Sequence, residues 1–402
     1  MLKSCFSLLQ FQSNLSITRL LQLKGLINSN FLRLYSTTNK ISKLPEKEPT
    51  NKLISCLKLM RADKPIACFK KVETSFTKPE TCFTKPETCF TKSEACFKKV
   101  EACTWLLYWP GAWSIALSAS PGCLPDAYLL GLFGVGSFLM RSAGCILNDL
   151  WDQDIDKKVS RTKSRPLANG ELTEKEAVLL LGGLLSASLA VLLQLNSFSI
   201  ILGASSLWLV VVYPLAKRFT NWPQLVLGAT FNWGALLGCT AVTGKFVPEI
   251  CIPLYLACIC WTMIYDTIYA FQDKKEDVLI GLGSTAITFD KNREAWLNFF
   301  GLTMMLNLLY SGYMQELPWP FFVSLLVSSS HLIWQIKTLK IDNNFDCLKK
   351  FNSNKFIGIT ILIGIILSNL IKNNEEVMEE RDDDEEENYG INKRNMNINF
   401  YC

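Results

Sequence analysis

Polar side chains with metal-binding chemistry recur at helical spacing directly after a long apolar run. Asn148, Asp152 and Asp156 are four residues apart, so a helix would place them on one face, about 6 Å from one another. Asp149 and Asp154 would point elsewhere on that helix. A row of oxygen ligands with open positions suits Mg²⁺ carried by a diphosphate. The alternative is a solvated acidic end of a helix.

A second acidic motif follows another apolar run, residues 250–265. Asp273 and Asp277 again lie one turn apart, and Asp266 lies almost two turns before Asp273 on nearly the same face. Carboxylates that face one another cannot all stay ionised without cations between them. The two motifs together therefore predict a divalent-metal site whose acids take part in catalysis.

Basic residues lie between and after the two acidic motifs. Lys163 and Arg165 belong to a loop, residues 157–165, that contains several cations and no acid. Lys217 ends another apolar segment, one turn after Tyr213. Lysine and arginine bind the phosphate oxygens that a metal ion leaves free. The alternative is that these cations only hold the loops at one membrane face.

The composition is that of a membrane protein. The chain has 402 residues, of which 49% are apolar, and its charge lies mostly outside the apolar runs. The net charge of +5 does not indicate a nucleic-acid partner, because the basic residues in loops form no continuous surface. The predicted fold is an all-α bundle with about nine spans in the bilayer. The predicted spans are 104–120, 127–147, 176–194, 198–214, 223–243, 250–270, 295–312, 318–336 and 356–371.

Cysteine and histidine usage excludes several kinds of site. The fifteen cysteines are scattered and include no pair with metal-binding spacing, so no disulfide framework is inferred. The single histidine, His331, lies in an apolar run, where packing or hydrogen bonding is its expected role. Catalysis by a histidine triad or by a cluster of histidine metal ligands is therefore excluded.

The N-terminal residues differ in composition from the apolar spans. Residues 1–52 are basic, rich in Leu, Phe and Ser, and contain no acid before Glu46, which is typical of a mitochondrial presequence followed by a linker. An ordinary basic amphipathic N-terminus is the alternative. Residues 53–67 predict an interfacial helix that ends at Pro65.

A repeated segment and an acidic tail flank the predicted membrane domain, residues 103–372. Residues 68–102 contain five copies of a seven-residue unit. Pro79 and Pro86 argue against a coiled coil, so a flexible low-complexity insert is expected. The tail, residues 373–402, is expected to be acidic and disordered.

Loop charges predict the membrane topology. Cations gather in the loops after the second, fourth, sixth and eighth spans, whereas the alternate loops contain almost none. By the positive-inside rule both acidic motifs lie at one membrane face, which in a mitochondrion is the matrix face.

The motifs together resemble the UbiA-type intramembrane prenyltransferases, and within them the branch that acts on 4-hydroxybenzoate. The resemblance covers residues 57–371 apart from the insert. It is carried by Arg61–Pro65, Thr104–Pro110, Arg141–Asp156, Ser164–Leu167, Tyr213–Arg218 and Tyr265–Thr285.

The resemblance implies a helical bundle around a central cavity that is open to lipid. It implies that Mg²⁺ is bound by Asn148, Asp152, Asp156, Asp273 and Asp277. It implies that the diphosphate is bound by Arg165, Lys217, Tyr213 and Lys163. Arg141, two turns before Asn148, is expected to meet the carboxylate of the aromatic acceptor.

The implied activity is transfer of a polyprenyl chain from polyprenyl diphosphate to 4-hydroxybenzoate, at the ring carbon ortho to the hydroxyl. This is an early step of ubiquinone biosynthesis in the mitochondrial inner membrane, and association with other enzymes of that pathway would fit it. The alternatives are a relative with haem, homogentisate or a naphthoate as acceptor, or a transporter. A transporter is disfavoured because the acids lie at one face rather than at the membrane midplane.

Two positions depart from the pattern of the mitochondrial members. Phe271 stands where they commonly have histidine, a change expected to affect packing alone. Gly283 stands where they commonly have lysine. The missing cation bears on substrate affinity or on the choice of acceptor.

Overall fold

The computed structural model describes residues 49–61, 86–157, 162 and 165–398. The chain divides into two units, Met1–Leu53 and Ile54–Cys402, and the second contains the bundle and the site. The described residues form helices and no strand. The helices are α2 (Pro49–Leu59), α4 (Pro86–Leu117), α5 (Ala127–Trp151), α6 (Gln153–Asp156), α7 (Glu174–Leu192), α8 (Ser197–Ser205), α9 (Leu207–Phe219), α10 (Pro223–Phe231), α11 (Trp233–Thr243), α12 (Pro248–Ala270), α13 (Lys274–Ile280), α14 (Thr285–Thr288), the 3₁₀ turn η2 (Asp290–Asn292), α15 (Arg293–Met314), α16 (Trp319–Lys337) and α17 (Asn344–Ile398).

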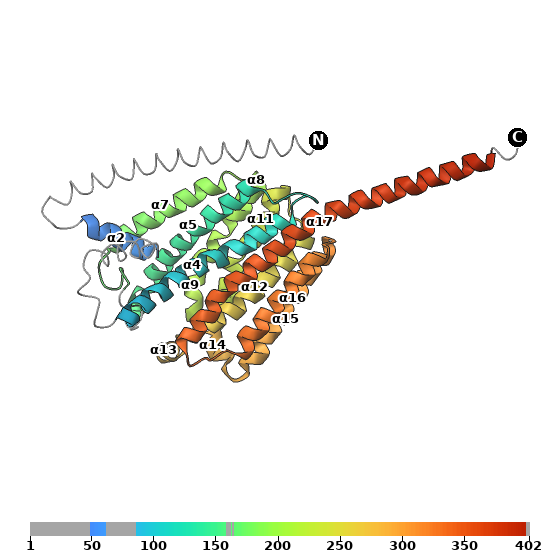
Figure 1. Ribbon diagram of the computed structural model, residues 1–402. Coiled ribbons are helices and arrows are strands. Elements are labelled where there is room, and N and C mark those ends of the chain that lie inside the picture. The colour runs from blue at the N-terminus through green and yellow to red at the C-terminus, as the bar shows by residue number, and fades with distance from the viewer. Residues whose placement is uncertain (1–48, 62–85, 158–161, 163–164, 399–402) are drawn as a thin grey trace. The chain divides into compact units, whose positions relative to one another are not determined.

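The long helices pack side by side, with α12 on the inside of the bundle (Figure 1). Helix α12 contacts α4, α10, α11, α15 and α17, and most of its side chains are buried. Helix α7 packs mainly against α5 and has a single buried residue, Ala177. Helix α12 is therefore a core element, whereas α7 exposes most of its apolar surface.

Two tryptophans join three helices in the core. The rings of Trp113 on α4 and Trp261 on α12 stack with centroids 5.1 Å apart. The indole nitrogen of Trp113 donates to the carbonyl oxygen of Gly358 at 2.8 Å, and that of Trp261 donates to Oδ1 of Asn354 at 2.9 Å. Both acceptors lie on α17, so these buried indoles have the partners that burial requires.

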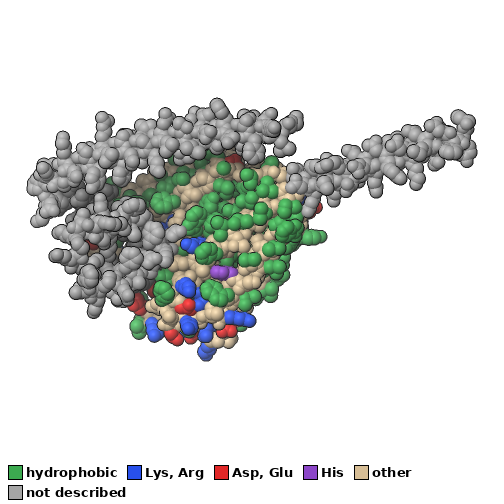
Figure 2. Space-filling view, in the orientation of Figure 1, with side chains coloured by type: hydrophobic (Ala, Val, Ile, Leu, Met, Phe, Trp, Pro, Cys, Tyr) green, Lys and Arg blue, Asp and Glu red, His purple; other side chains and the backbone are tan. Residues whose placement is uncertain are grey.

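The surface of the bundle is apolar between charged ends. Figure 2 shows hydrophobic side chains over most of the visible face, and Lys, Arg, Asp and Glu gathered at its lower end. The exposed apolar residues on α15, α16 and α17 include Leu302, Leu306, Tyr313, Leu326, Ile333, Ile359 and Ile363. Apolar side chains that face outward, bounded by charges, are the pattern of a protein embedded in lipid.

Six helical stretches among the described residues are long and apolar enough to cross a bilayer. Two of them join a pair of helices, α8 with α9 and α10 with α11. The three remaining predicted spans, 104–120, 295–312 and 318–336, are also helical but do not belong to the six. The polytopic all-α class is confirmed, and the count of nine spans stays a prediction. The six stretches are Ala127–Trp151, Glu174–Leu192, Ser197–Phe219, Pro223–Thr243, Pro248–Ala270 and Asn344–Lys372.

The interfacial helix differs from its prediction. Helix α2 ends at Leu59 rather than at Pro65, because Arg61 adopts a positive φ of 58° and turns the chain out of the helix. Residues 62–67, and residues 1–48 of the predicted presequence and linker (residues 1–52), lie outside the described part of the chain.

Two segments expected to be unstructured contain helix. Helix α4 begins at Pro86, so the last two repeats of the 68–102 insert continue into the first predicted span. Proline suits the first position of a helix, and no other proline follows until Pro110. Helix α17 likewise continues to Ile398 through the acidic tail, where no proline occurs after Lys372 to end it.

His331 has the structural role expected of it. Its Nε2 lies 3.1 Å from Oγ of Ser353, and its ring packs against Trp334 with centroids 5.3 Å apart. The contact joins α16 to α17.

A buried lysine fastens the same two helices. Lys350 is only 2% exposed, and its ammonium donates to the Thr338 carbonyl at 2.9 Å and to the Asp346 carboxylate at 2.5 Å. We expect Lys350→Met to lower the free energy of unfolding by about 3 kcal/mol, because loss of a buried cation leaves its partners uncompensated. Thermal unfolding in detergent measures this. Lys349→Met, at the exposed neighbouring position, is the control, and equal melting temperatures for the two variants would contradict the prediction.

Candidate active site

One large cavity receives both acidic motifs. It has a volume of about 1260 Å³ and lies between α5, α7, α9, α11 and the C-terminal end of α12. Nine of the ten predicted site residues line it: Arg141, Asn148, Asp152, Asp156, Arg165, Tyr213, Lys217, Asp273 and Asp277. The tenth, Lys163, lies outside the described residues.

The spacing predicted that the first acidic motif lies on one continuous helix, and the structure shows a break instead. Helix α5 ends at Trp151, Asp152 caps it, and the short helix α6 follows. The amide of Asp152 still donates to the Asn148 carbonyl at 2.9 Å, and the amide of Asp156 donates to the Asp152 carbonyl at 2.8 Å. The four-residue spacing therefore persists through the break, and all three side chains reach the cavity.

The carboxylates of this motif pair with the predicted phosphate-binding cations. Nζ of Lys217 lies 3.1 Å from Oδ2 of Asp152, and Nη1 of Arg165 lies 2.6 Å from Oδ2 of Asp156. Burial raises the pKa of Asp156 above its ordinary value, although Arg165 acts to lower it. An added cation would therefore stabilise the ionised form of Asp156.

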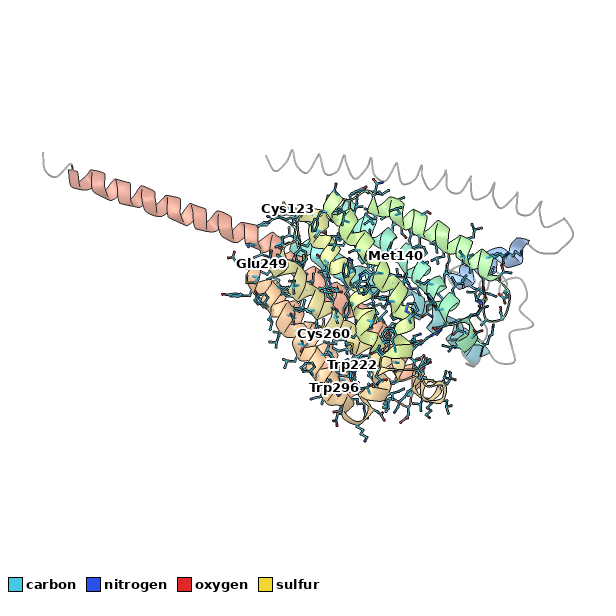
Figure 3. All side chains as sticks on the ribbon, turned by 180° about the vertical axis from the view of Figure 1, so that it is seen from behind. Cys123, Met140, Trp222, Glu249, Cys260 and Trp296 are labelled. Carbon is cyan, nitrogen blue, oxygen red and sulfur yellow. The ribbon has the colours of Figure 1, made fainter. Side chains whose placement is uncertain are left out.

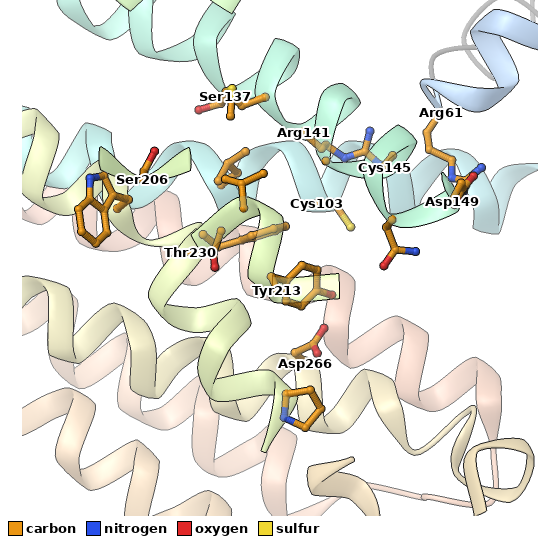
Figure 4. Close-up of a pocket in the computed structure, with 18 of the residues that line it drawn as sticks. Arg61, Cys103, Ser137, Arg141, Cys145, Asp149, Ser206, Tyr213, Thr230 and Asp266 are labelled. Carbon is orange, nitrogen blue, oxygen red and sulfur yellow. Dashed lines mark hydrogen bonds and ion pairs between the residues drawn. The ribbon is translucent and has the colours of Figure 1, made fainter. Parts of the chain in front are cut away.

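Asp149 was expected to point away from this face, and the structure corrects that prediction. Its side chain is 1% exposed and lines the same cavity. Both of its carboxylate oxygens lie 3.0 Å from Nη2 of Arg61 (Figure 4), and Oδ1 also accepts from Nη1 of Arg165 at 2.9 Å. The two guanidinium groups account for the burial of this charge, because a buried carboxylate requires cationic partners.

The second acidic motif also follows a break in a helix. Helix α12 ends at Ala270, and Asp273 is the N-cap of α13. The amide of Asp277 donates to the Asp273 carbonyl at 2.9 Å, which keeps these residues one turn apart. Asp266 lies deeper, where its carboxylate faces the side chain of Tyr213 (Figure 4).

The donor atoms of both motifs are oxygens, the ligand type that Mg²⁺ prefers. Within the described residues, no group of three or more His, Cys, Asp or Glu side chains is close enough to hold a metal ion. Asp152 and Asp156 pair with cations instead. The donor chemistry fits an ion that arrives with a diphosphate, whose oxygens would complete its ligands.

Arg141 is the one cation among the described residues of the cavity with buried donors that lack a partner. Its side chain is 7% exposed, and Nε and Nη1 have no hydrogen-bond partner. It projects from α5 into the cavity near Cys145 (Figure 4). A buried guanidinium with unmet donors favours an anionic group in its immediate surroundings.

The cavity changes character away from the acids. Its walls there are apolar side chains with a few hydroxyls, of which Ser137, Ser206 and Thr230 appear in Figure 4. The apolar lining includes Leu132, Phe133, Met140, Leu185, Leu189, Leu192, Leu207, Val210 and Leu237. One end of the cavity can therefore bind a charged group while the other end accepts a hydrocarbon chain.

A loop after α13 packs tightly against the segment that contains Lys217. The amide of Gly283 donates to the Lys217 carbonyl at 3.0 Å. The amide of Thr285, two residues later, donates to Oε1 of the buried Gln224 at 3.1 Å. Beneath this loop Trp222 packs edge-on against Trp296 with centroids 5.6 Å apart; Figure 3 shows both at the end of the bundle opposite Cys123 and Glu249.

The close contact explains the glycine at position 283. A Cβ there would collide with the carbonyl oxygen of Thr220, a backbone atom that no rotamer change can move. Position 283, where the mitochondrial members commonly have lysine, therefore has no room for a side chain in this protein. Phe271, the other departure, is buried in the hydrophobic core, which agrees with the expectation that this change affects packing.

We expect Gly283→Ala to raise the KM for the diphosphate substrate that the sequence predicts by roughly tenfold, because it displaces the backbone that positions Lys217. The KM for the acceptor should change much less. Steady-state kinetics with each substrate varied in turn measures both. Gly182→Ala on α7, where a Cβ meets nothing within 4 Å, is the control, and equal kinetics in the two variants would refute the prediction.

Arg61 and Gln272 line the cavity but were not among the predicted site residues, and Nε2 of Gln272 is buried without a hydrogen-bond partner. Arg61 belongs to a motif that carries the resemblance, but its role at the site could not be predicted because its partner Asp149 lies 88 positions away. Gln272 directly precedes Asp273, and that adjacency was its only clue.

Comparison with known proteins agrees with this geometry. Residues 107–359 match the UbiA prenyltransferase family. The chain is 55% identical over 269 residues to a Caenorhabditis elegans protein named 4-hydroxybenzoate polyprenyltransferase, mitochondrial, covering 67% of this chain and 76% of that one. It is 52% identical over 272 residues to the Homo sapiens protein of the same name, covering 68% and 73%.

A solved structure shares the fold. It is the apo structure of a UbiA homolog from Aeropyrum pernix K1, with a TM-score of 0.56 and 25% identity, covering 65% of this chain and 97% of that one. The family match covers more than half of the chain and includes both acidic motifs and the helices that carry them. This chain therefore belongs to the UbiA prenyltransferase family.

Proposed function

We propose that the protein transfers a polyprenyl chain from polyprenyl diphosphate to 4-hydroxybenzoate, in ubiquinone biosynthesis. The observation that carries the proposal is a single cavity with three kinds of lining. Two acidic motifs with their cations lie at one end of the cavity and apolar side chains at the other. Arg141, which has two buried donors without a partner, lines the same cavity. The names of the relatives agree with this reaction.

Arg165 and Lys217 bind the diphosphate. Each already lies beside a carboxylate, at 2.6 Å and 3.1 Å, so each can exchange that partner for a phosphate oxygen with a small movement. Tyr213 lines the cavity from the same helix as Lys217 and offers a hydroxyl donor. Lys163 would add a further cation.

The residues that would hold Mg²⁺ are Asn148, Asp152, Asp156, Asp273 and Asp277. Bound there, the ion would neutralise the charge that develops on the leaving diphosphate. Arg165 and Lys217 contribute to the same stabilisation, because they are preorganised beside the site.

The acceptor binds through its carboxylate. Nε and Nη1 of Arg141 are buried without a partner, and either of them can donate a charge-assisted hydrogen bond to that carboxylate. Arg141 lies seven residues, or about two turns, before Asn148 on α5, so the bound ring lies deeper in the cavity than the diphosphate.

The reaction forms a carbon–carbon bond. The ring carbon ortho to the phenol oxygen attacks C1 of the allylic chain, and the C1–oxygen bond breaks with its electron pair leaving on diphosphate. The ring then loses the proton from the attacked carbon to a nearby carboxylate, for which Asp273 is the candidate. The apolar walls exclude water from the cation-like carbon.

We place the reaction in the mitochondrial inner membrane, with the acidic end of the cavity toward the matrix. The relatives are named as mitochondrial proteins, and six described helices are apolar enough to cross a bilayer. The basic loops beside the acidic motifs agree with the positive-inside rule. A bilayer also dissolves the prenyl chain, since burial of each CH₂ contributes about 0.8 kcal/mol.

The test is mass spectrometry of products from the purified protein in nanodiscs with Mg²⁺, 4-hydroxybenzoate and prenyl diphosphates of several lengths. Homogentisate, a dihydroxynaphthoate and haem are supplied in parallel. The expected product is 3-polyprenyl-4-hydroxybenzoate. Transfer to another acceptor, with none to 4-hydroxybenzoate, would contradict the proposed substrate while leaving the family intact.

A further inference from the structure

Arg61 stands at an unusual turn beside the cavity. Helix α2 ends at Leu59, and Arg61 has a φ of 58°, a conformation that non-glycine residues rarely adopt. Its amide donates to the Lys58 carbonyl at 3.1 Å, and its guanidinium reaches the carboxylate of Asp149 (Figure 4). The backbone conformation therefore directs the side chain into the cavity wall.

The same turn is fastened to the loop that contains Arg165. Leu59 is fully buried in a cluster with Ile146, Leu167 and Leu172. On the preceding turn of α2, Ser55 and Lys58 donate to the carboxylate of Glu171 at 3.0 and 3.3 Å. Burial acts to raise the pKa of Glu171, but hydrogen bonds from Ser55, Asn169 and Lys58 hold it below its ordinary value. Residues 55–59 of α2 and residues 165–172 are thus packed together.

Arg61, Asp149, Arg165 and Asp156 form a chain of ion pairs beside this contact. Asp149 accepts hydrogen bonds from two guanidinium groups, those of Arg61 and Arg165. Arg165 in turn donates to two carboxylates, those of Asp149 and Asp156. Without Arg61, the buried Asp149 would depend on Arg165 as its remaining cation partner among the described contacts.

We propose that Arg61 is a positioning residue that neutralises Asp149 and so leaves Arg165 free to bind the diphosphate. The inference rests on the proposed role of Arg165 in diphosphate binding. Removal of Arg61 would bind Arg165 more tightly to Asp149 and withdraw it from the substrate. Helix α2, which precedes the membrane bundle, would thereby act on a residue that lies 104 positions later in the chain.

A direct role for Arg61 predicts a different result. If Arg61 itself bound the diphosphate, its loss could not be repaired by changing Asp149. If it acts by neutralising Asp149, then removal of that negative charge removes the need for Arg61. The variants R61M, D149N and R61M/D149N separate the two roles.

The experiment uses the full-length protein in nanodiscs and two measurements. The first is binding of inorganic pyrophosphate with Mg²⁺, in the absence of any acceptor. The second is the KM for each substrate in the transfer reaction. We expect R61M to weaken pyrophosphate binding and raise the KM for prenyl diphosphate roughly tenfold, with the KM for 4-hydroxybenzoate nearly unchanged. R61K, which keeps the cation, should recover most of the loss.

The double variant decides the matter. We expect R61M/D149N to bind pyrophosphate about as well as D149N, and D149N to bind it at least as well as the unchanged protein. A double variant as weak as R61M, or a D149N variant that binds poorly, would overturn the proposal. If R61M alone does not fold, R61M/D149N compared with D149N still separates the two roles. Failure of transfer to 4-hydroxybenzoate would contradict the proposed function alone, because the pyrophosphate measurement uses no acceptor.

Discussion

Replacement of Asp152 by asparagine is expected to lower the turnover of prenyl transfer on the order of 10³-fold while the protein still folds and inserts into the membrane. The Asp152 carboxylate lies 3.1 Å from the Lys217 ammonium and 3.9 Å from Arg218 Nη2, at the junction of α5 and α6. Asparagine keeps the size of the side chain and removes its charge. The loss would therefore fall on metal and diphosphate binding rather than on packing.

The control is Asp154→Asn, two residues away. The Asp154 side chain is 92% exposed and pairs only with Lys157 on the same turn, among the contacts described. Product formation, measured at saturating Mg²⁺ and in a Mg²⁺ titration, should be unchanged in this control. Normal turnover of Asp152→Asn would exclude Asp152 from the metal site, and an equal loss in both variants would indicate a general effect of charge on the loop.

Arg141→Met is expected to raise the KM for 4-hydroxybenzoate roughly 100-fold and to leave the KM for prenyl diphosphate within about twofold, since a charged hydrogen bond contributes about 1.5–3 kcal/mol. The substituted protein should also lose its preference for 4-hydroxybenzoate over 4-hydroxybenzamide. The reason is that Nε and Nη1 of Arg141 are buried and have no hydrogen-bond partner in the protein.

The stability of the same variant separates a binding role from a structural one. A buried cation with unmet donors destabilises the protein, so we expect Arg141→Met to melt at the same temperature as the unchanged protein or higher. A large fall in melting temperature, with no change in the preference for the carboxylate, would show that Arg141 serves packing instead. Thermal unfolding in detergent without substrate is the measurement.

Much of the fold was predictable because it depends on local patterns. Long apolar runs between charged loops identified the helices of the bundle, and all nine predicted spans are helical. Two helix boundaries were predicted wrongly because each depends on a contact with a distant residue. Helix α2 ends at Leu59, before the turn at Arg61, whose side chain meets Asp149, and the α5 segment breaks at Asp152, whose partner is Lys217.

The sequence by itself determined which residues are predicted to do chemistry at this site. Oxygen-bearing side chains four residues apart are expected to share a helical face, so Asn148, Asp152, Asp156, Asp273 and Asp277 could be predicted as metal ligands without coordinates. The cations Arg165 and Lys217 followed from the need to balance those acids. Each inference uses neighbours within a few residues, which helical geometry fixes.

Only the tertiary structure decided how those residues pair. Arg61 and Asp149 are 88 positions apart, and Gly283 lies against Thr220 because two loops meet at the cavity. Nε and Nη1 of Arg141 likewise lack partners because of the helices packed around it, not because of its neighbours in sequence. Burial and pairing between distant segments are set by how the helices pack, and no local period in the chain encodes them.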